Sequence, residues 1–141
     1  MTSGRGRRIA FDYGQARIGV AICDPDGILA TPLPHLLATH PKVLQQIISL
    51  IDEYQPITIF VGYPRNMSGE PGKAVELVDA FIKSLQSLTP IPIVSVDERL
   101  STVSAARKLR DSGKSSRESR SQIDSMAAVT ILEAGLANEN E

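Results

Sequence analysis

The sequence of 141 residues has no tryptophan, a single cysteine and few aromatic side chains, which make up 4% of the chain. One cysteine, Cys23, excludes an intramolecular disulfide, and together with the absence of an apolar leader it favours a reducing cytoplasm. No apolar run approaches the roughly 18 residues that span a bilayer, so we expect no membrane segment. With 42% hydrophobic and 22% charged residues, the composition predicts an ordinary globular protein.

The net charge is small, at −1, but it is unevenly distributed along the chain. Residues 99–120 carry seven basic and two acidic side chains, a net charge of +5, whereas the rest of the chain carries −6. A basic segment of this kind either binds the phosphate backbone of a nucleic acid or forms a solvated helix face and loop. The charge pattern alone does not separate these two interpretations.

The order of the expected elements predicts an α/β fold. We expect five strands, over residues 9–13, 17–23, 28–37, 57–62 and 93–96. We expect four helices, two beginning near Pro41 and Ala74 and two spanning 101–109 and 119–136. Short turns join the first three strands, which should pair antiparallel, whereas helical crossovers precede the other two. The prediction is a five-stranded mixed sheet with helices on both faces.

The domain organisation that we expect is simple. Residues 8–137 form one domain, between a disordered basic tail at 1–7 and a short tail at 138–141, because neither end has apolar side chains to bury. Pro32 and Pro34 place the third strand at an edge of the sheet, since proline cannot donate a hydrogen bond to a neighbouring strand.

A lone carboxylate, Asp12, interrupts the first apolar strand. Burying an unpaired charge is costly, and a bound metal ion is one way to compensate it. Alternation along the strand puts Ala10 on the same face as Asp12, and this small neighbour leaves room for a helix to approach closely. We therefore expect Asp12 to belong to a site.

Asp124 is a second candidate acid. Ala127 and Ala128 follow it at i+3 and i+4, so Asp124 lies on the apolar stripe of the last helix, where a surface aspartate is not expected. The alternative is that Asp124 lies near the start of the helix only to interact with its dipole.

Asp97 and Glu98 supply a third acid at the end of the fifth strand. Side chains alternate along a strand, so only one of the two should face Asp12, and the alternative role is to cap the following helix. Three carboxylates brought together would repel one another, and a hard cation such as Mg²⁺ or Mn²⁺ would relieve that repulsion.

Four blocks of sequence occur in a fixed order along the chain. They are Asp12-Tyr13-Gly14 with Arg17-Ile18-Gly19-Val20-Ala21, the Gly62–Gly69 loop, Asp97-Glu98-Arg99-Leu100-Ser101-Thr102, and the final helix from Asp124 to Glu133. Together they resemble the YqgF family, also called RuvX, whose members are described as pre-16S rRNA nucleases. The resemblance spans residues 8 to about 136.

The resemblance implies an RNase H-like fold related to Holliday junction resolvases, and a cytoplasmic nuclease that matures the 5′ end of pre-16S rRNA. It implies that Asp12, Glu98 and Asp124 hold Mg²⁺ or Mn²⁺, with Asp97 as the reserve for the middle acid. With the charge pattern, it indicates a set of residues that contact nucleic acid, namely Arg17, Asn66, Arg99, Arg117 and Arg120.

The expected reaction is metal-assisted hydrolysis of a phosphodiester bond. Two alternatives remain open at this point: a resolvase that acts on branched DNA, and a nucleic-acid-binding module without catalysis. A fragment of a sugar kinase or actin-type ATPase is disfavoured, because those proteins need two such domains around the nucleotide. A structural protein with an incidental cluster of acids is a further alternative. The sequence does not choose between a monomer and a homodimer.

Overall fold

The computed structural model describes residues 5–64, 72–97 and 117–139, and for residues 117–124 it describes the backbone alone. Within these ranges it has five strands, β1 (Arg8–Tyr13), β2 (Arg17–Cys23), β3 (Ala30–Leu37), β4 (Thr58–Tyr63) and β5 (Ile93–Asp97). It also has three helices, α1 (Val43–Tyr54), α2 (Lys73–Leu88) and α4 (Arg117–Glu139). The helix predicted over 101–109 lies outside the described residues. No helix in the described ranges is long and apolar enough to cross a bilayer.

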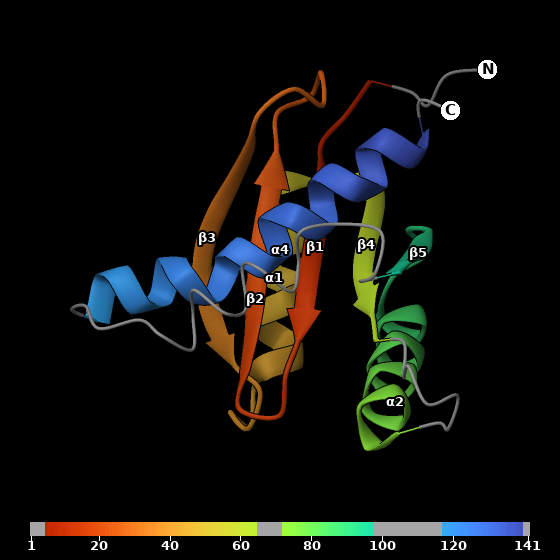
Figure 1. Ribbon diagram of the computed structural model, residues 1–141. Coiled ribbons are helices and arrows are strands. Elements are labelled where there is room, and N and C mark those ends of the chain that lie inside the picture. The colour runs from red at the N-terminus through yellow and green to blue at the C-terminus, as the bar shows by residue number, and fades with distance from the viewer. Residues whose placement is uncertain (1–4, 65–71, 98–116, 140–141) are drawn as a thin grey trace.

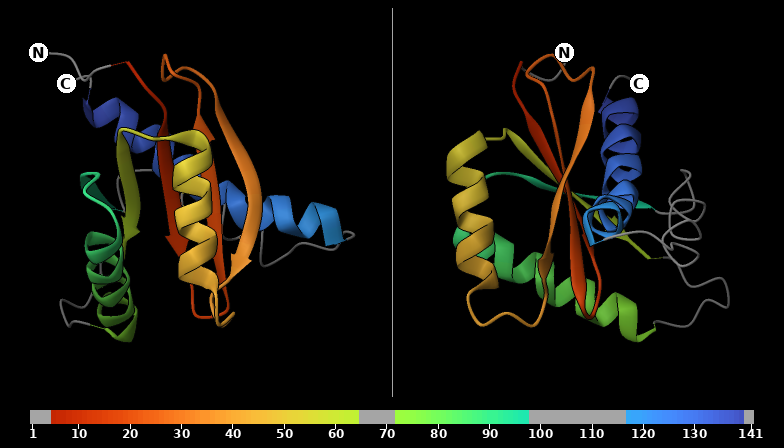
Figure 2. Two further views of the ribbon diagram at one scale, coloured as in Figure 1. Left: turned by 180° about the vertical axis from the view of Figure 1, so that it is seen from behind. Right: turned by 90° about the vertical axis from the view of Figure 1, so that its left-hand side faces the viewer.

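The five strands form one sheet in the order β3-β2-β1-β4-β5. Neighbouring strands are antiparallel from β3 to β1, whereas β4 is parallel to both β1 and β5. Helix α4 crosses one face of the sheet, and α1 and α2 cover the other (Figure 1, Figure 2). The predicted mixed sheet with helices on both faces is confirmed, as is the edge position of the proline-containing strand β3.

Each face of the sheet buries its own apolar cluster. On the side of α1 and α2, the larger residues of β1, such as Phe11, pack with Phe81 of α2. On the side of α4, the cluster is built around smaller side chains, among them Ala10 of β1 and Ala127 and Ala128 of α4, which are at most 1% exposed. The prediction that these alanines allow the last helix to pack closely on the sheet is therefore confirmed.

Close packing between α4 and β4 leads to a stability prediction at Gly135. A Cβ atom added at this residue would lie 2.7 Å from ring atoms of Phe60, which is 1% exposed and cannot move freely. Overpacking costs roughly 1–3 kcal/mol, against a gain of about 1 kcal/mol in helix propensity. The difference between these terms is about 0–2 kcal/mol, and we expect Gly135→Ala to lower the free energy of unfolding by about 1 kcal/mol in urea denaturation. Adding Phe60→Leu should recover part of that loss, and a fully stable single variant would contradict the packing argument.

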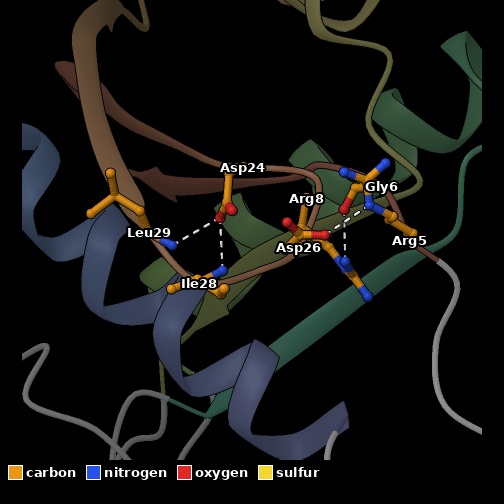
Figure 3. A network of polar contacts seen from close by, with 7 residues as sticks. All are labelled: Arg5, Gly6, Arg8, Asp24, Asp26, Ile28 and Leu29. Atoms are coloured by element: carbon orange, nitrogen blue, oxygen red, sulfur yellow. Dashed lines mark hydrogen bonds and ion pairs between the residues drawn. The ribbon is translucent and has the colours of Figure 1, made fainter.

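The residues before β1 pack against the turn between β2 and β3 (Figure 3). Arg5 Nε lies 2.7 Å from Asp26 Oδ1, and the Gly6 N–H donates to the Pro25 carbonyl at 2.8 Å. The Arg7 carbonyl accepts a hydrogen bond from the Ile57 N–H. Within the range predicted as a tail, residues 5–7 therefore contact two neighbouring segments through their polar groups. Residues 1–4 lie outside the described ranges.

The Asp24 side chain organises the turn that follows β2. Its Oδ1 accepts hydrogen bonds from the N–H groups of Ile28 and Leu29, at 2.7 and 2.8 Å, as Figure 3 shows. The bond from Leu29, with that from Ile28, lowers the pKa of the Asp24 carboxyl. Because these two N–H groups are bonded to Asp24, β3 starts at Ala30 and not at Ile28 as predicted. The predicted turn is confirmed, with Gly27 at a φ of 71°.

A buried arginine connects the start of β1 to the end of α4. The Arg8 side chain is 5% exposed, and its Nη2 lies 2.7 Å from Glu139 Oε1. Its Nη1 donates to the Gly6 carbonyl, and its backbone N–H donates to Cys23 Sγ. Burial raises the pKa of the Cys23 thiol. Helix α4 extends to Glu139, two residues into the range predicted as a tail, and the ion pair connects its last turn to Arg8.

Candidate active site

Asp12 lies near the carboxyl end of the central strand β1, and it is 3% exposed. It shares the α4 face of the sheet with Ala10, as predicted. Gly19 of β2 pairs with Asp12, and the β1–β4 register continued by one residue sets Gly62 on its other side. Neither neighbour in this row has a side chain, so the strands flanking Asp12 leave space beside its carboxylate for another group.

Asp97 lies on the opposite face of the sheet from Asp12. It pairs with Tyr63 of β4, whose hydroxyl donates to Asp79 of α2 at 3.0 Å. The preceding residue, Val96, is 1% exposed and belongs to the cluster under α4. Alternation therefore assigns Asp97 to the side of α1 and α2, the face opposite to Asp12. Glu98 lies outside the described residues.

Helix α4 is attached to the sheet through Ser125, which is 0% exposed. The Ser125 hydroxyl donates to the Leu33 carbonyl of β3 at 2.5 Å and accepts from the Val20 N–H of β2 at 3.2 Å. Val20 follows Gly19, the residue that pairs with Asp12. The helix thus meets β2 at the level of Asp12. Asp124 precedes Ser125 in α4, and its side chain lies outside the description.

Ser125 is not among the predicted site residues, although the pattern of the last helix indicates that this residue is buried. It lies three residues before Ala128 and seven before Leu132, so it occupies the same buried stripe of the helix. A hydroxyl on such a stripe must find a partner, since an unsatisfied buried polar group is costly. The identity of that partner depends on tertiary structure, which the helix period does not reveal.

Of the five residues predicted to contact nucleic acid, Arg17 is the one whose side chain lies in the described part of the chain. It is exposed at the start of β2, two residues before Gly19, and so lies on the same face of the sheet as Asp12. A tight turn precedes it, in which the Gly14 N–H donates to the Arg17 carbonyl at 2.9 Å. A Cβ atom at Gly14 would lie 2.8 Å from that oxygen, so the turn requires glycine.

The other predicted contacts are less fully described. Arg117 and Arg120 belong to α4, but only their backbone is described, and Asn66 and Arg99 lie outside the described residues. Within the described part of the chain, no group of three His, Cys, Asp or Glu side chains could hold a metal ion. Of the three predicted acids, only the Asp12 side chain falls within that part. Its carboxylate is a hard oxygen donor of the kind that Mg²⁺ and Mn²⁺ prefer.

Two solved structures align with this chain over most of its length. Thermus thermophilus RuvC, in complex with a Holliday junction substrate, aligns with a TM-score of 0.57 and 12% identity over 96% of each chain. The yeast mitochondrial Holliday junction resolvase Ydc2 aligns with a TM-score of 0.56 and 11% identity, over 99% of this chain and 82% of its own. At these identities the likeness shows the fold, which is RNase H-like.

Sequence comparison finds much closer relatives. A protein of Rhodococcus erythropolis is 49% identical over 139 residues, which cover 94% of this chain and 78% of the relative. One of Streptomyces avermitilis is 46% identical over 137 residues, which cover 96% of this chain and 88% of the relative. Both carry the provisional name of pre-16S rRNA nuclease. The family model of RuvX, described as Holliday junction resolvase, matches residues 6–138, and the chain therefore belongs to the RuvX family.

Proposed function

We propose that this protein is a metal-dependent nuclease that hydrolyses phosphodiester bonds at the 5′ end of pre-16S rRNA, in the cytoplasm. The observation that carries the proposal is Asp12, a carboxylate that is 3% exposed in the central strand. Its neighbour Gly19 contributes no side chain to the space beside it. Buried carboxylates of this kind are characteristic of sites that bind a cation.

Asp12, Glu98 and Asp124 would together hold Mg²⁺ or Mn²⁺. When bound, such an ion supplies an activated water and stabilises the charge that develops on the phosphate. The protein's own contribution is to hold the carboxylates in position and to bind the nucleic-acid backbone. Arg17, on the same face as Asp12, and the basic segment 99–120 would bind phosphates with little dependence on sequence.

RNA is the proposed substrate because the relatives named for it are far more similar to this chain. Proteins named as pre-16S rRNA nucleases are 46–49% identical to it, whereas the aligned resolvase structures are 11–12% identical. The second candidate substrate is a four-way DNA junction, which the description of the RuvX family favours.

A cleavage assay with and without metal tests this proposal. The full chain is incubated with a labelled pre-16S rRNA fragment or a four-way DNA junction, in Mn²⁺, in Mg²⁺ or in excess EDTA. We expect the RNA to be cut in either ion, no cleavage in EDTA, and recovery when Mn²⁺ is restored, because a hard cation must offset the repulsion of the acids. Products are resolved on denaturing gels.

Each of the other outcomes would change a different part of this proposal. Cleavage of the junction alone would replace the RNA nuclease with a DNA resolvase. Salt-sensitive binding to both substrates, without cleavage in any ion, would indicate a binding module. Cleavage that persists in EDTA would contradict metal dependence.

A further inference from the structure

The pairing between β2 and β3 is irregular beside Asp12. Ile18 pairs with Leu36 and Val20 pairs with Leu33, so two steps along β2 correspond to three along β3. One extra residue is thus accommodated in β3, which is the definition of a bulge. The residue of β2 at this irregularity is Gly19, the partner of Asp12 on the other side. Bulges often occur next to active sites, where they redirect the chain.

The Ser125 hydroxyl lies at this irregularity, between the two strands. It accepts from the Val20 N–H and donates to the Leu33 carbonyl, which belong to paired residues of β2 and β3. One hydroxyl from α4 therefore satisfies a donor of one strand and an acceptor of the next. Because Ser125 is 0% exposed, loss of its hydroxyl would leave the Val20 N–H and the Leu33 carbonyl without this buried partner, which is costly.

These two hydrogen bonds constrain α4 near Asp124 in a way that its apolar contacts do not, whereas the Arg8–Glu139 ion pair acts at the far end of the helix. On the C-terminal side of Ser125, the helix packs on the sheet through Ala127, Ala128 and larger apolar side chains. Apolar contacts are not directional, whereas a hydrogen bond weakens steeply when its angle changes. A hydroxyl held by two strands therefore defines both the rotation of α4 and its position along the sheet.

We propose that Ser125 is a positioning residue for the metal site, a role that rests on the proposed function. Ser125 itself would contact no reacting atom. It would act through two neighbours: Asp124, which precedes it in α4, and Gly19, which precedes Val20 in β2 and pairs with Asp12. Fixing the helix at this level sets the separation between the two acid-bearing backbones. Residues that orient metal ligands in this way usually matter almost as much as the ligands.

Ser125→Ala tests the role against a matched control, Thr130→Val. Thr130 is also buried in α4, but its hydroxyl donates to the Ala127 carbonyl within the helix. Each variant loses one buried hydroxyl, and only Ser125→Ala loses a bond to the sheet. Mn²⁺ binding is titrated without nucleic acid, from the electron paramagnetic resonance signal of the free ion. Thermal unfolding and Mn²⁺-dependent cleavage are measured on the same proteins.

We expect Ser125→Ala to weaken Mn²⁺ binding about 10-fold or more, as loss of a ligand-orienting residue usually does. Thr130→Val should bind within about twofold of the wild type, because its hydroxyl orients no ligand. Ser125→Cys, whose thiol is a weak donor and acceptor, should fall between the two and serves the same comparison if the alanine variant does not fold.

Equal Mn²⁺ affinity in Ser125→Ala, Ser125→Cys and Thr130→Val would overturn the positioning role. If the wild type in that case still binds Mn²⁺ and cleaves, the proposed function stands and only this inference fails. A wild type that neither binds Mn²⁺ nor cleaves nucleic acid would overturn both.

Discussion

Asp12→Asn is expected to lower the rate of Mn²⁺-dependent cleavage by about 10³-fold or more, which corresponds to ~4 kcal/mol of activation free energy. Asparagine is close to aspartate in size and keeps one oxygen, but it carries no charge and binds a hard cation weakly. Asp12 is 3% exposed, so no neighbouring water can easily substitute for the missing carboxylate. Single-turnover rates at saturating protein measure the effect on the chemical step directly.

The control for this variant is Asp52→Asn. Asp52 is exposed on α1, which covers the opposite face of the sheet, so the same chemical change there should leave the rate within about twofold. Thermal unfolding of Asp12→Asn should show a folded protein, because removing a buried charge does not add a desolvation cost. Full activity in a folded Asp12→Asn protein would remove Asp12 from the site.

The fold was predictable because its main features are periodic in sequence. Alternation in β1 separates Ala10 and Asp12 from Phe11, and the structure puts these residues on the two faces as expected. The small residues Ala127 and Ala128 mark the face of α4 that meets the sheet. Such patterns arise from local geometry, so they do not depend on the rest of the chain.

Features that depend on contacts between distant residues were not predictable. Arg8 and Glu139 are 131 residues apart in sequence, and nothing in either segment alone indicates that they form an ion pair. The Ser125 bridge between Val20 and Leu33 likewise requires knowledge of strand register. For the same reason, alternation predicted that one of Asp97 and Glu98 faces Asp12 without saying which. The pairing of Asp97 with Tyr63, which sets the face on which Asp97 lies, likewise could not be read from the sequence.

The pairing of Asp97 leads to the second large prediction, a contrast between two adjacent acids. Glu98→Gln is expected to lower the cleavage rate by about 10²-fold or more, because a ligand of the proposed metal site contributes several kcal/mol to the reaction. Asp97→Asn should keep the rate within about threefold, since Asp97 lies on the face covered by α1 and α2. Rates are measured with the same labelled RNA over a range of Mn²⁺ concentrations.

The two variants change adjacent residues, and each replaces a carboxylate by the corresponding amide. They therefore serve as controls for each other. A loss of stability in Asp97→Asn, seen as a lower melting temperature with the cleavage rate unchanged, would reflect a structural role of Asp97 and not a role in catalysis. If Asp97→Asn lost the activity and Glu98→Gln kept it, the third acid would have to reach the site from the opposite face of the sheet. Val96, 1% exposed within the α4 cluster, makes that geometry incompatible with a regular strand β5. The contrast therefore tests whether the alternation of β5 carries through to the residue that follows it.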